Sequence, residues 1–389
     1  MPLKSLRILD LSRLLPGPYC SMFFSDFGAE VIKVEEPGLG DYVRWFNPKV
    51  DDNSAIFHSL NRNKKSVTLN LKSEKGKELF KQLAKTADIV IESFRPGVME
   101  KLGLDYENLK KINKKLIYCA ITGYGQEGPY SQMAGHDINY LSYAGLLGLQ
   151  GDFKGPPKLS SVQIADIGGG AQMAVIGILI ALHARNVTGE GQFVDISMTD
   201  GVLSWMQSIF PDYFTNQKFP ERGKLRTGGG KACYYIYETS DQRYLSVGAL
   251  EEKFWKVFCH VIGVPHLIPR LNDDFEGQQK MIEEIGLVIK KKTLPEWISL
   301  FEGKDACVSP VLNLDEVLDD PQFQYRQMFI EPELESKTIR HIDVPIRLSS
   351  TPGRVKNSAP GIGEHNEEVF LELGYSNEDI AGWKKQGIM

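Results

Sequence analysis

Short apolar runs alternate with amphipathic stretches over the first 120 or so residues. The apolar runs are four to six residues long, which is the length of buried strands. The stretches between them carry apolar residues at helical spacing. Strands alternating with helices predict a parallel sheet covered on both faces. The expected strands are Arg7–Leu11, Glu30–Val34, Ser66–Leu71, Ile89–Glu92 and Leu116–Ile121, and the expected helices are Tyr19–Phe27 and Glu74–Lys85.

The pattern changes after Phe219. Residues 220–231 are rich in glycine and charge and resemble a linker. Two alternating runs then flank Asp241-Gln242, which predicts an antiparallel hairpin followed by helices. This part of the chain is expected to form a small α+β domain. The hairpin strands are Cys233–Tyr237 and Tyr244–Val247, and the helices are Glu252–Val261, Gln278–Lys291, Thr293–Phe301 and, after a proline-rich stretch, Glu367–Leu373.

The composition restricts the class of ligand. The chain has 389 residues and a net charge of −5, so nothing in its bulk charge attracts nucleic acid or an anionic membrane. Its five scattered cysteines suggest free thiols in a reducing compartment. The N-terminus lacks the apolar stretch of a signal peptide, and the most apolar helix expected, Ala171–Leu182, is too short to span a bilayer. We therefore expect a cytoplasmic protein with neither membrane nor nucleic-acid partner.

Several common cofactor and catalytic signatures are missing from the sequence. No GxGxxG follows the first strand, and the glycine runs 168–170 and 228–230 lack the lysine-serine pair of a P-loop. The seven histidines are far apart, without HxxxH or HExxH spacing, so no metal site is expected. No GxSxG elbow supports a serine hydrolase. We expect no bound cofactor and no metal.

A histidine and an aspartate are the first candidates for chemistry. His136 precedes Asp137 after a glycine-rich turn, and such a histidine can act as a general base near neutral pH or simply cap a helix. Asp166 precedes Gly168-Gly169-Gly170, where a helix start offers N–H groups to an enolate oxygen. Asp166 itself can be an acid, a base, a nucleophile or a plain helix cap. Position and spacing alone leave these alternatives open.

Basic residues gather where strands are expected to end. The carboxyl ends of parallel strands are the edge at which open α/β sheets bind ligands. Cations concentrated there in an acidic protein suggest phosphate binding, although any single lysine is more often a solvated surface group. The residues are Arg62, Lys64, Lys65, Lys72, Arg95 and Lys101.

Longer segments carry a resemblance to a known family. The chain resembles the family III CoA-transferases (CaiB/BaiF superfamily), and within them the α-methylacyl-CoA racemases. The matching segments are 7–37 (RILDLSRLLPGPYCSMFFSDFGAEVIKVEEP), 61–73 (NRNKKSVTLNLKS), 92–104 (ESFRPGVMEKLGL), 122–141 (TGYGQEGPYSQMAGHDINYL), 188–201 (TGEGQFVDISMTDG), 247–255 (VGALEEKFW) and 305–317 (DACVSPVLNLDEV).

This resemblance implies an architecture. It implies a Rossmann-like large domain, a small domain in the middle of the chain, and an interlocked homodimer. The expected boundaries are residues 1–218 for the CoA-binding large domain, 219–335 for the small α+β domain, and 336–389 for a segment returning to the large domain.

The resemblance also implies residue roles. His136 and Asp166 would be the two acid/base groups, with Glu251 supporting His136. The substrate is expected to be an acyl-CoA, with coenzyme A as part of the substrate rather than a cofactor. The residues implied to contact it are Arg62, Leu69, Asn70, Leu71, Lys72, Ser93, Phe94, Arg95 and Lys101, together with Gly135, Asp137, Ile138, Asn139 and Tyr140.

Three functions remain at this point. A 2-methylacyl-CoA racemase would move the proton next to the thioester carbonyl, and the GHDINY segment with His136 favours it. A CoA-transferase would use Asp166 as a nucleophile; the long stretch Gly40–Asn61 favours it, and Glu36 stands where some racemases carry an arginine toward the nucleotide. A non-catalytic acyl-CoA binding protein is disfavoured by the paired acid/base candidates.

Overall fold

The computed structural model describes residues 1–331 and 339–389, which form two compact units. The first contains residues 1–144, 161–205 and 321–389, and the second contains residues 145–160 and 206–320. These limits differ from the expected boundaries most clearly at residues 145–160, which we had expected in the large domain. This segment packs within the second unit, where Arg222 donates a hydrogen bond to the Gly148 carbonyl at 2.8 Å.

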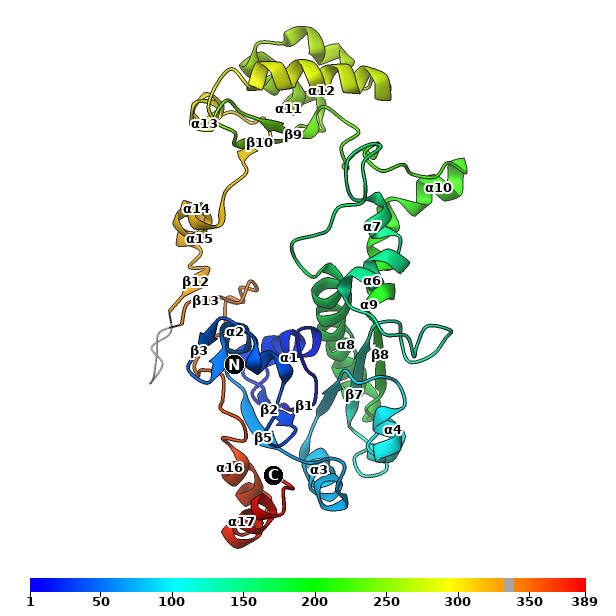
Figure 1. Ribbon diagram of the computed structural model, residues 1–389, viewed down its shortest axis with the longest axis vertical. Coiled ribbons are helices and arrows are strands. Elements are labelled where there is room, and N and C mark those ends of the chain that lie inside the picture. Colours follow the sequence, from blue (N-terminus) through cyan, green and yellow to red (C-terminus); the bar gives the residue numbers. More distant parts are fainter. Residues whose placement is uncertain (332–338) are drawn as a thin grey trace. The chain divides into compact units, whose positions relative to one another are not determined.

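A six-stranded parallel sheet forms the centre of the first unit (Figure 1). Counted along the chain, its strands have the order 3-2-1-4-5-6, the arrangement of the Rossmann fold. The predicted α/β class is therefore confirmed. In spatial order the strands are β5 (Lys65–Thr68), β2 (Glu30–Glu35), β1 (Arg7–Asp10), β6 (Ile89–Glu92), β7 (Ile117–Thr122) and β8 (Phe193–Ser197), of which only β8 had not been predicted.

Helices cover both faces of this sheet, as the apolar runs require. One face packs on α3 (Glu74–Thr86), α4 (Val98–Leu102), α5 (Tyr106–Leu109), α16 (Asn366–Glu372) and α17 (Asn377–Lys385). The other face packs on α1 (Pro16–Asp26) and α8 (Met173–Thr188). The C-terminal segment thus returns to the first unit, where the Asn70 N–H donates to the Ile388 carbonyl at 2.8 Å.

The second unit has its own sheet and core. Its antiparallel strands have the order β11-β10-β9, and the predicted hairpin is β9 and β10. Three helices cover one face, with Trp255, Phe258 and Trp297 in the core between them. The elements are β9 (Tyr234–Glu238), β10 (Tyr244–Gly248), β11 (Val308–Pro310), α11 (Glu252–Ile262), α12 (Phe275–Ile289) and α13 (Leu294–Phe301).

The remaining elements are short. In the first unit they are η1 (Tyr42–Trp45), β3 (Lys49–Val50), β4 (Asn53–Ser54), α2 (Ala55–Asn61), α6 (Asp137–Tyr143), α9 (Met198–Ser204), α15 (Pro321–Tyr325), β12 (Phe329–Ile330) and β13 (His341–Ile342). In the second unit they are α7 (Leu146–Leu149), α10 (Phe210–Asn216), η4 (Pro265–Arg270) and α14 (Leu314–Asp319), and η3 (Trp205–Ser208) begins at the last residue of the first unit.

The glycine run 168–170 lies inside a helix rather than at its start. A π-helical segment, η2 (Ala165–Gln172), continues directly into α8, so the helix spans 24 residues. A Cβ on Gly169 would lie 2.5 Å from the Met198 carbonyl oxygen, and one on Gly168 would lie 2.0 Å from the Trp205 ring. The glycines therefore allow the backbones of η2 and α9 to approach each other closely.

This helix also corrects the expectation of a 12-residue apolar helix. Within the described residues, Ala165–Thr188 is the one helix that could cross a membrane by length and composition, and 44% of its most apolar window is buried. Helix α8 packs on β7 and β8 of the central sheet. A helix that covers a sheet in this way can have the same length and composition as a membrane-spanning helix.

Gly201→Ala is expected to destabilise the first unit by about 1–3 kcal/mol, because overpacking at a tight contact forces the backbone to shift. The added Cβ would lie 2.1 Å from the Gly169 carbonyl oxygen. Gly286→Ala is the matched control, since Gly286 lies within α12 with nothing within 4 Å of an added Cβ. The control should stabilise by about 0.5–1 kcal/mol. Urea unfolding of both variants tests this, and equal effects would contradict it.

Candidate active site

Asp137 brings two distant segments together. Its Oδ1 accepts hydrogen bonds from the backbone N–H groups of Ala165 (2.6 Å) and Asp166 (3.0 Å). Asp137 is the first residue of α6 and follows His136, which is the N-cap of that helix. The start of η2 is thus fixed against the start of α6. His136 and Asp166, separated by 30 positions in the sequence, are thereby held in one site.

The Asp166 carboxyl group has an altered acidity. Burial and, to a smaller extent, the nearby charge of Asp137 raise its pKa to about 6, while the charge of His136 opposes the change. A carboxyl group with this pKa exchanges protons readily near neutral pH. Desolvation combined with a specific charged neighbour is the pattern seen at catalytic carboxyl groups.

His136 is exposed and available to a ligand. Its backbone N–H donates to the Asn139 Oδ1 at 3.1 Å, so the side chain of Asn139 completes the start of α6. The histidine is therefore the helix-capping residue that the sequence had suggested as an alternative, but through its backbone. Its imidazole stays at the surface beside Asp166. Ile138 and Asn139 are also exposed, whereas Gly135 is partly buried.

Tyr140 supports the turn that carries His136. Its side chain is buried, and its hydroxyl donates to the Gly135 carbonyl at 2.7 Å. Burial, followed by the charge of Asp166, raises the pKa of Tyr140 to about 12, while the charge of Arg95 opposes the change. Tyr124 packs edge-on against the Tyr140 ring at 5.2 Å. Arg95 thus lies within electrostatic reach of Tyr140.

The ends of β1 and β6 form the topological switch point of the sheet. From β1 the chain order runs outward through β2 and β5 on one side and through β6, β7 and β8 on the other. Ligands of open α/β sheets bind in the crevice at such a point. Ser93, Phe94 and Arg95 follow β6 here, and the Ser93 hydroxyl accepts a hydrogen bond from the Arg13 N–H at 3.3 Å.

The next predicted contacts lie further along the same edge. Leu69 follows β5, and its side chain is buried in the core. The Asn70 Oδ1 accepts from the Lys72 N–H at 3.0 Å, which shapes the turn, and Leu71 packs partly against the core. Lys72 and Lys101 are exposed cations. Exposed atoms of this turn can therefore meet a ligand, while the Leu69 side chain cannot.

Arg62 has a different role from the predicted one. Its guanidinium is buried, pairs with Asp26 at 2.7 Å, and donates from Nη1 to the Ile342 carbonyl at 2.9 Å. Lys64 is likewise buried, 3.3 Å from Asp10. Breaking such buried pairs is costly, so these two cations stabilise the fold rather than bind phosphate.

Glu251 belongs to the second unit. It is the N-cap of α11, and within the described residues its carboxylate caps none of the helix N–H groups. The side chain is exposed. Its predicted support of His136 stays a prediction.

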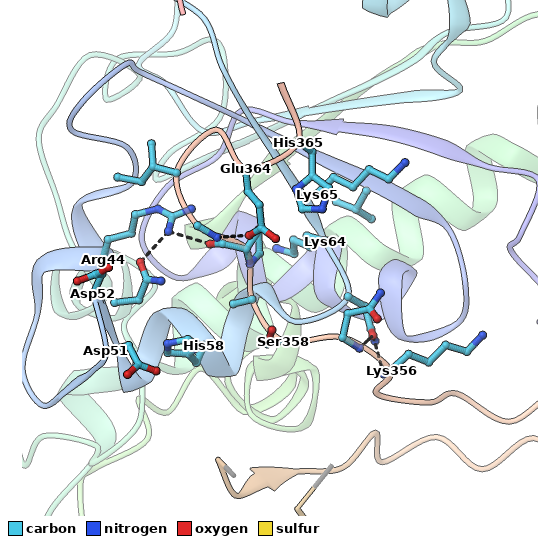
Figure 2. A pocket seen from close by; sticks show the side chains of 18 of the residues that line it. Arg44, Asp51, Asp52, His58, Lys64, Lys65, Lys356, Ser358, Glu364 and His365 are labelled. Carbon is cyan, nitrogen blue, oxygen red and sulfur yellow. Dashed lines mark hydrogen bonds between the residues drawn. The ribbon is translucent and has the colours of Figure 1, made fainter. Parts of the chain in front are cut away.

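A cavity of about 1300 Å³ opens elsewhere on the first unit (Figure 2). It is lined by side chains of both charge signs, including Arg44, Asp52, His58 and Glu364. None of the predicted catalytic or CoA-contacting residues lines it, but Lys64 and Lys65, two of the basic residues singled out in the sequence, do. The cavity is therefore separate from the predicted acid/base pair, which lies at the open edge of the sheet.

Asp137→Asn is expected to lower the pKa of Asp166, because it removes the neighbouring negative charge while keeping an oxygen that accepts from the Ala165 and Asp166 N–H groups. The acid limb of the pH–activity profile should therefore move to lower pH. Asn139→Asp is the charge-adding counterpart on the same helix turn and should not move the limb downward. An unchanged limb in Asp137→Asn would contradict the electrostatic assignment.

The fold is that of a Rossmann-like α/β protein, and several of the predicted ligand contacts lie at the switch-point edge of its sheet. The sequence profile of CoA-transferase family III matches residues 3–366. Human α-methylacyl-CoA racemase is 34% identical over 98% of this chain and 95% of that protein. Human succinyl-CoA:glutarate CoA-transferase is 32% identical over all of this chain and 90% of that protein. The chain belongs to CoA-transferase family III.

A solved structure agrees with this membership. A CaiB/BaiF family protein from Brucella suis superposes with a TM-score of 0.85 at 31% identity, covering 96% of this chain and 99% of that one. The relatives include both racemases and transferases at similar identity. The chain is therefore an enzyme of this superfamily, and the choice of reaction depends on the site.

Proposed function

We propose that the protein is a 2-methylacyl-CoA racemase that transfers the α-proton through an enolate. His136 and Asp166 would be the two acid/base groups, one on each face of the substrate. The observation that supports this most strongly is the Asp137 bridge, which holds Asp166 beside His136. The Asp166 carboxyl group, with a pKa of about 6, can take and return a proton near neutral pH, and the exposed imidazole of His136 is the second proton-transfer group beside it.

The proposed reaction has two balanced steps. The basic form of one group takes the proton from Cα, and the electron pair of that C–H bond moves into the thioester to give the enolate. The acidic form of the other group then returns a proton to the opposite face of Cα, and the thioester carbonyl re-forms. Each turnover exchanges the roles of His136 and Asp166.

One expected source of enolate stabilisation has to be corrected. The N–H groups of Asp166 and Ile167 are already engaged, the first by Asp137 and the second by the Gln163 carbonyl at 3.1 Å. These two donors at the helix start are therefore not available to the enolate oxygen. The hydrogen bonds instead fix the position of the Asp166 carboxyl group, which is what a reaction sensitive to distance requires.

A CoA-transferase reaction is the second candidate. Asp166 would attack the thioester carbonyl, release CoA as a thiol and form a mixed anhydride. The observation in its favour is that transferases resemble this chain about as closely as racemases do. That reaction gives no role to an exposed histidine beside the carboxyl group, which is why we favour the racemase.

A paired assay separates the two reactions. The protein is incubated with (S)-2-methylacyl-CoA, with and without succinate, and the products are separated by chiral chromatography and mass spectrometry. The racemase predicts a mixture of both epimers without any acceptor acid and no succinyl-CoA. Formation of succinyl-CoA together with unchanged stereochemistry would refute the racemase and identify a transferase.

A further inference from the structure

Arg13 lies at the switch point, where two aromatic rings and a carboxylate surround its side chain. Its guanidinium carbon is 5.0 Å from the centre of the Tyr42 ring and 5.4 Å from that of the Phe94 ring. The Nη1 donates to the Tyr42 hydroxyl at 2.9 Å, and the Nη2 lies 3.8 Å from the Glu36 carboxylate. Cation–π contacts to two rings restrain an arginine that is still 28% exposed.

The loop that carries Arg13 is held in place by Asp41. The Asp41 carboxylate accepts from the N–H groups of Leu14 (3.0 Å) and Val43 (3.1 Å), and it pairs with the buried Lys33 at 2.9 Å. Leu14 adopts a left-handed backbone with φ of 64°, which is strained for a branched residue. Local strain that the surroundings hold in place is common at ligand-binding sites.

The position of Arg13 relates to the length of the coenzyme. His136 follows β7 in the chain, and Asp166 lies in η2, which contacts β7. Arg13 follows β1, and Glu36 follows β2. Three strand spacings of about 4.8 Å, roughly 14 Å, separate β7 from β2 along this edge. If the pantetheine arm runs along this edge from a thioester at the acid/base pair, the nucleotide comes to the ends of β1 and β2.

The charges at this end favour a phosphate. Glu36 directly follows β2, where Rossmann folds place the acidic residue that binds a ribose hydroxyl. Here Glu36 is flanked by two cations, Arg13 at 3.8 Å and Lys72 at 3.4 Å. Within the described residues, the Arg13 guanidinium donates a single hydrogen bond, to the Tyr42 hydroxyl. Its other N–H groups therefore remain for a ligand.

We propose that Arg13, restrained by Tyr42 and Phe94, recognises the 3′-phosphate of the CoA ribose, with Lys72 assisting and the Glu36 carboxylate competing with the phosphate for both cations. This inference rests on the proposed use of a CoA thioester, and it makes Arg13 a specificity residue for the nucleotide end. The planar N–H pairs of a guanidinium match the oxygens of a phosphate, and the two rings beside Arg13 limit its movement.

The test compares free CoA with 3′-dephospho-CoA by isothermal titration, so it needs no turnover. The wild-type protein should bind CoA about tenfold or more tightly than dephospho-CoA, as expected for a charge-assisted pair. Arg13→Met should abolish most of this ratio by weakening CoA and leave dephospho-CoA affinity within about twofold. Arg354→Met, at an exposed arginine outside this cluster, is the matched control and should leave both affinities unchanged.

A second variant guards against a purely structural effect of the first. Glu36→Gln removes the competing negative charge, so it should raise the CoA to dephospho-CoA ratio by a few fold, which loss of loop structure would not do. Equal weakening of both ligands in Arg13→Met, or a wild-type protein that does not distinguish them, would overturn the assignment of Arg13. Failure of wild-type protein to bind either ligand would overturn the CoA-dependent function as well.

Discussion

Asp166→Asn is expected to reduce turnover by about a thousandfold or more, because Asp166 is one of the two proton-transfer groups and an amide can neither take nor return the proton. The same change should stabilise the protein by about 1–3 kcal/mol above pH 6, since it removes a carboxylate from a site that disfavours its charge. The shape of the side chain and the Asp137 hydrogen bonds to the backbone are retained.

The sign of the stability effect follows from the raised pKa. A carboxyl group whose pKa is about 6 in the folded protein contributes stability that is full below the unfolded value of 3.8 and is lost as the pH rises through 6. The variant should therefore melt higher than wild type at pH 7.5 and at the same temperature at pH 3.5–4. Thermal unfolding across this range is the measurement.

An exposed carboxylate provides the control for this experiment. Asp319→Asn changes an exposed aspartate in the second unit and should leave turnover unchanged and the free energy of unfolding within about 0.5 kcal/mol of wild type. If Asp166→Asn retained more than a tenth of wild-type turnover, Asp166 would not be a proton-transfer group or a nucleophile. A pH-independent gain in stability would mean that packing, not charge, caused it.

His136→Ala is expected to slow epimerisation by about 100- to 10,000-fold, the range lost with a general acid or base. Because Asp166 remains, the variant should still exchange the α-proton of one epimer with solvent, from one face and without inversion. Its affinity for CoA should stay within about threefold of wild type, since the switch-point residues are untouched. The pH profile and chiral analysis of recovered substrate measure these effects.

The matched control is His183→Ala, at an exposed histidine on α8. It should behave as wild type in both assays. Retention of CoA transfer to succinate at the wild-type rate in His136→Ala, with epimerisation absent from wild type itself, would assign the site to a transferase. An equal loss of CoA affinity and turnover would make His136 a binding residue instead.

Much of the fold could be predicted from the sequence because the central strands are buried on both faces. Such strands read as continuous apolar runs, as in Ile89–Glu92, where every residue is buried. Strand β8 was missed because it lies at the sheet edge and exposes residues such as Phe193. The start of the helix after Asp166 was misjudged because the glycines, which usually mark an end or a turn, here serve close packing against α9.

The site could be predicted only in part. The residues at the strand ends follow from the alternation of strands and helices, but the pairing of His136 with Asp166 depends on a hydrogen bond between segments 28 positions apart. Arg62 and Lys64 looked like phosphate ligands because a sequence does not show which cations meet a buried aspartate. Arg13 was missed because a lone arginine in a loop belongs to no sequence motif. Only the structure shows that two aromatic rings lie beside its side chain.

The most direct test of the central claim is proton NMR of (S)-2-methylacyl-CoA with the purified enzyme in D2O, without an acceptor acid. The account predicts that the α-proton signal disappears as the (R) epimer forms, that the epimerised product carries deuterium at Cα, and that neither event occurs with Asp166→Asn. Retention of the α-proton and of the (S) configuration across several acyl chains, with protein that still binds CoA, would contradict it.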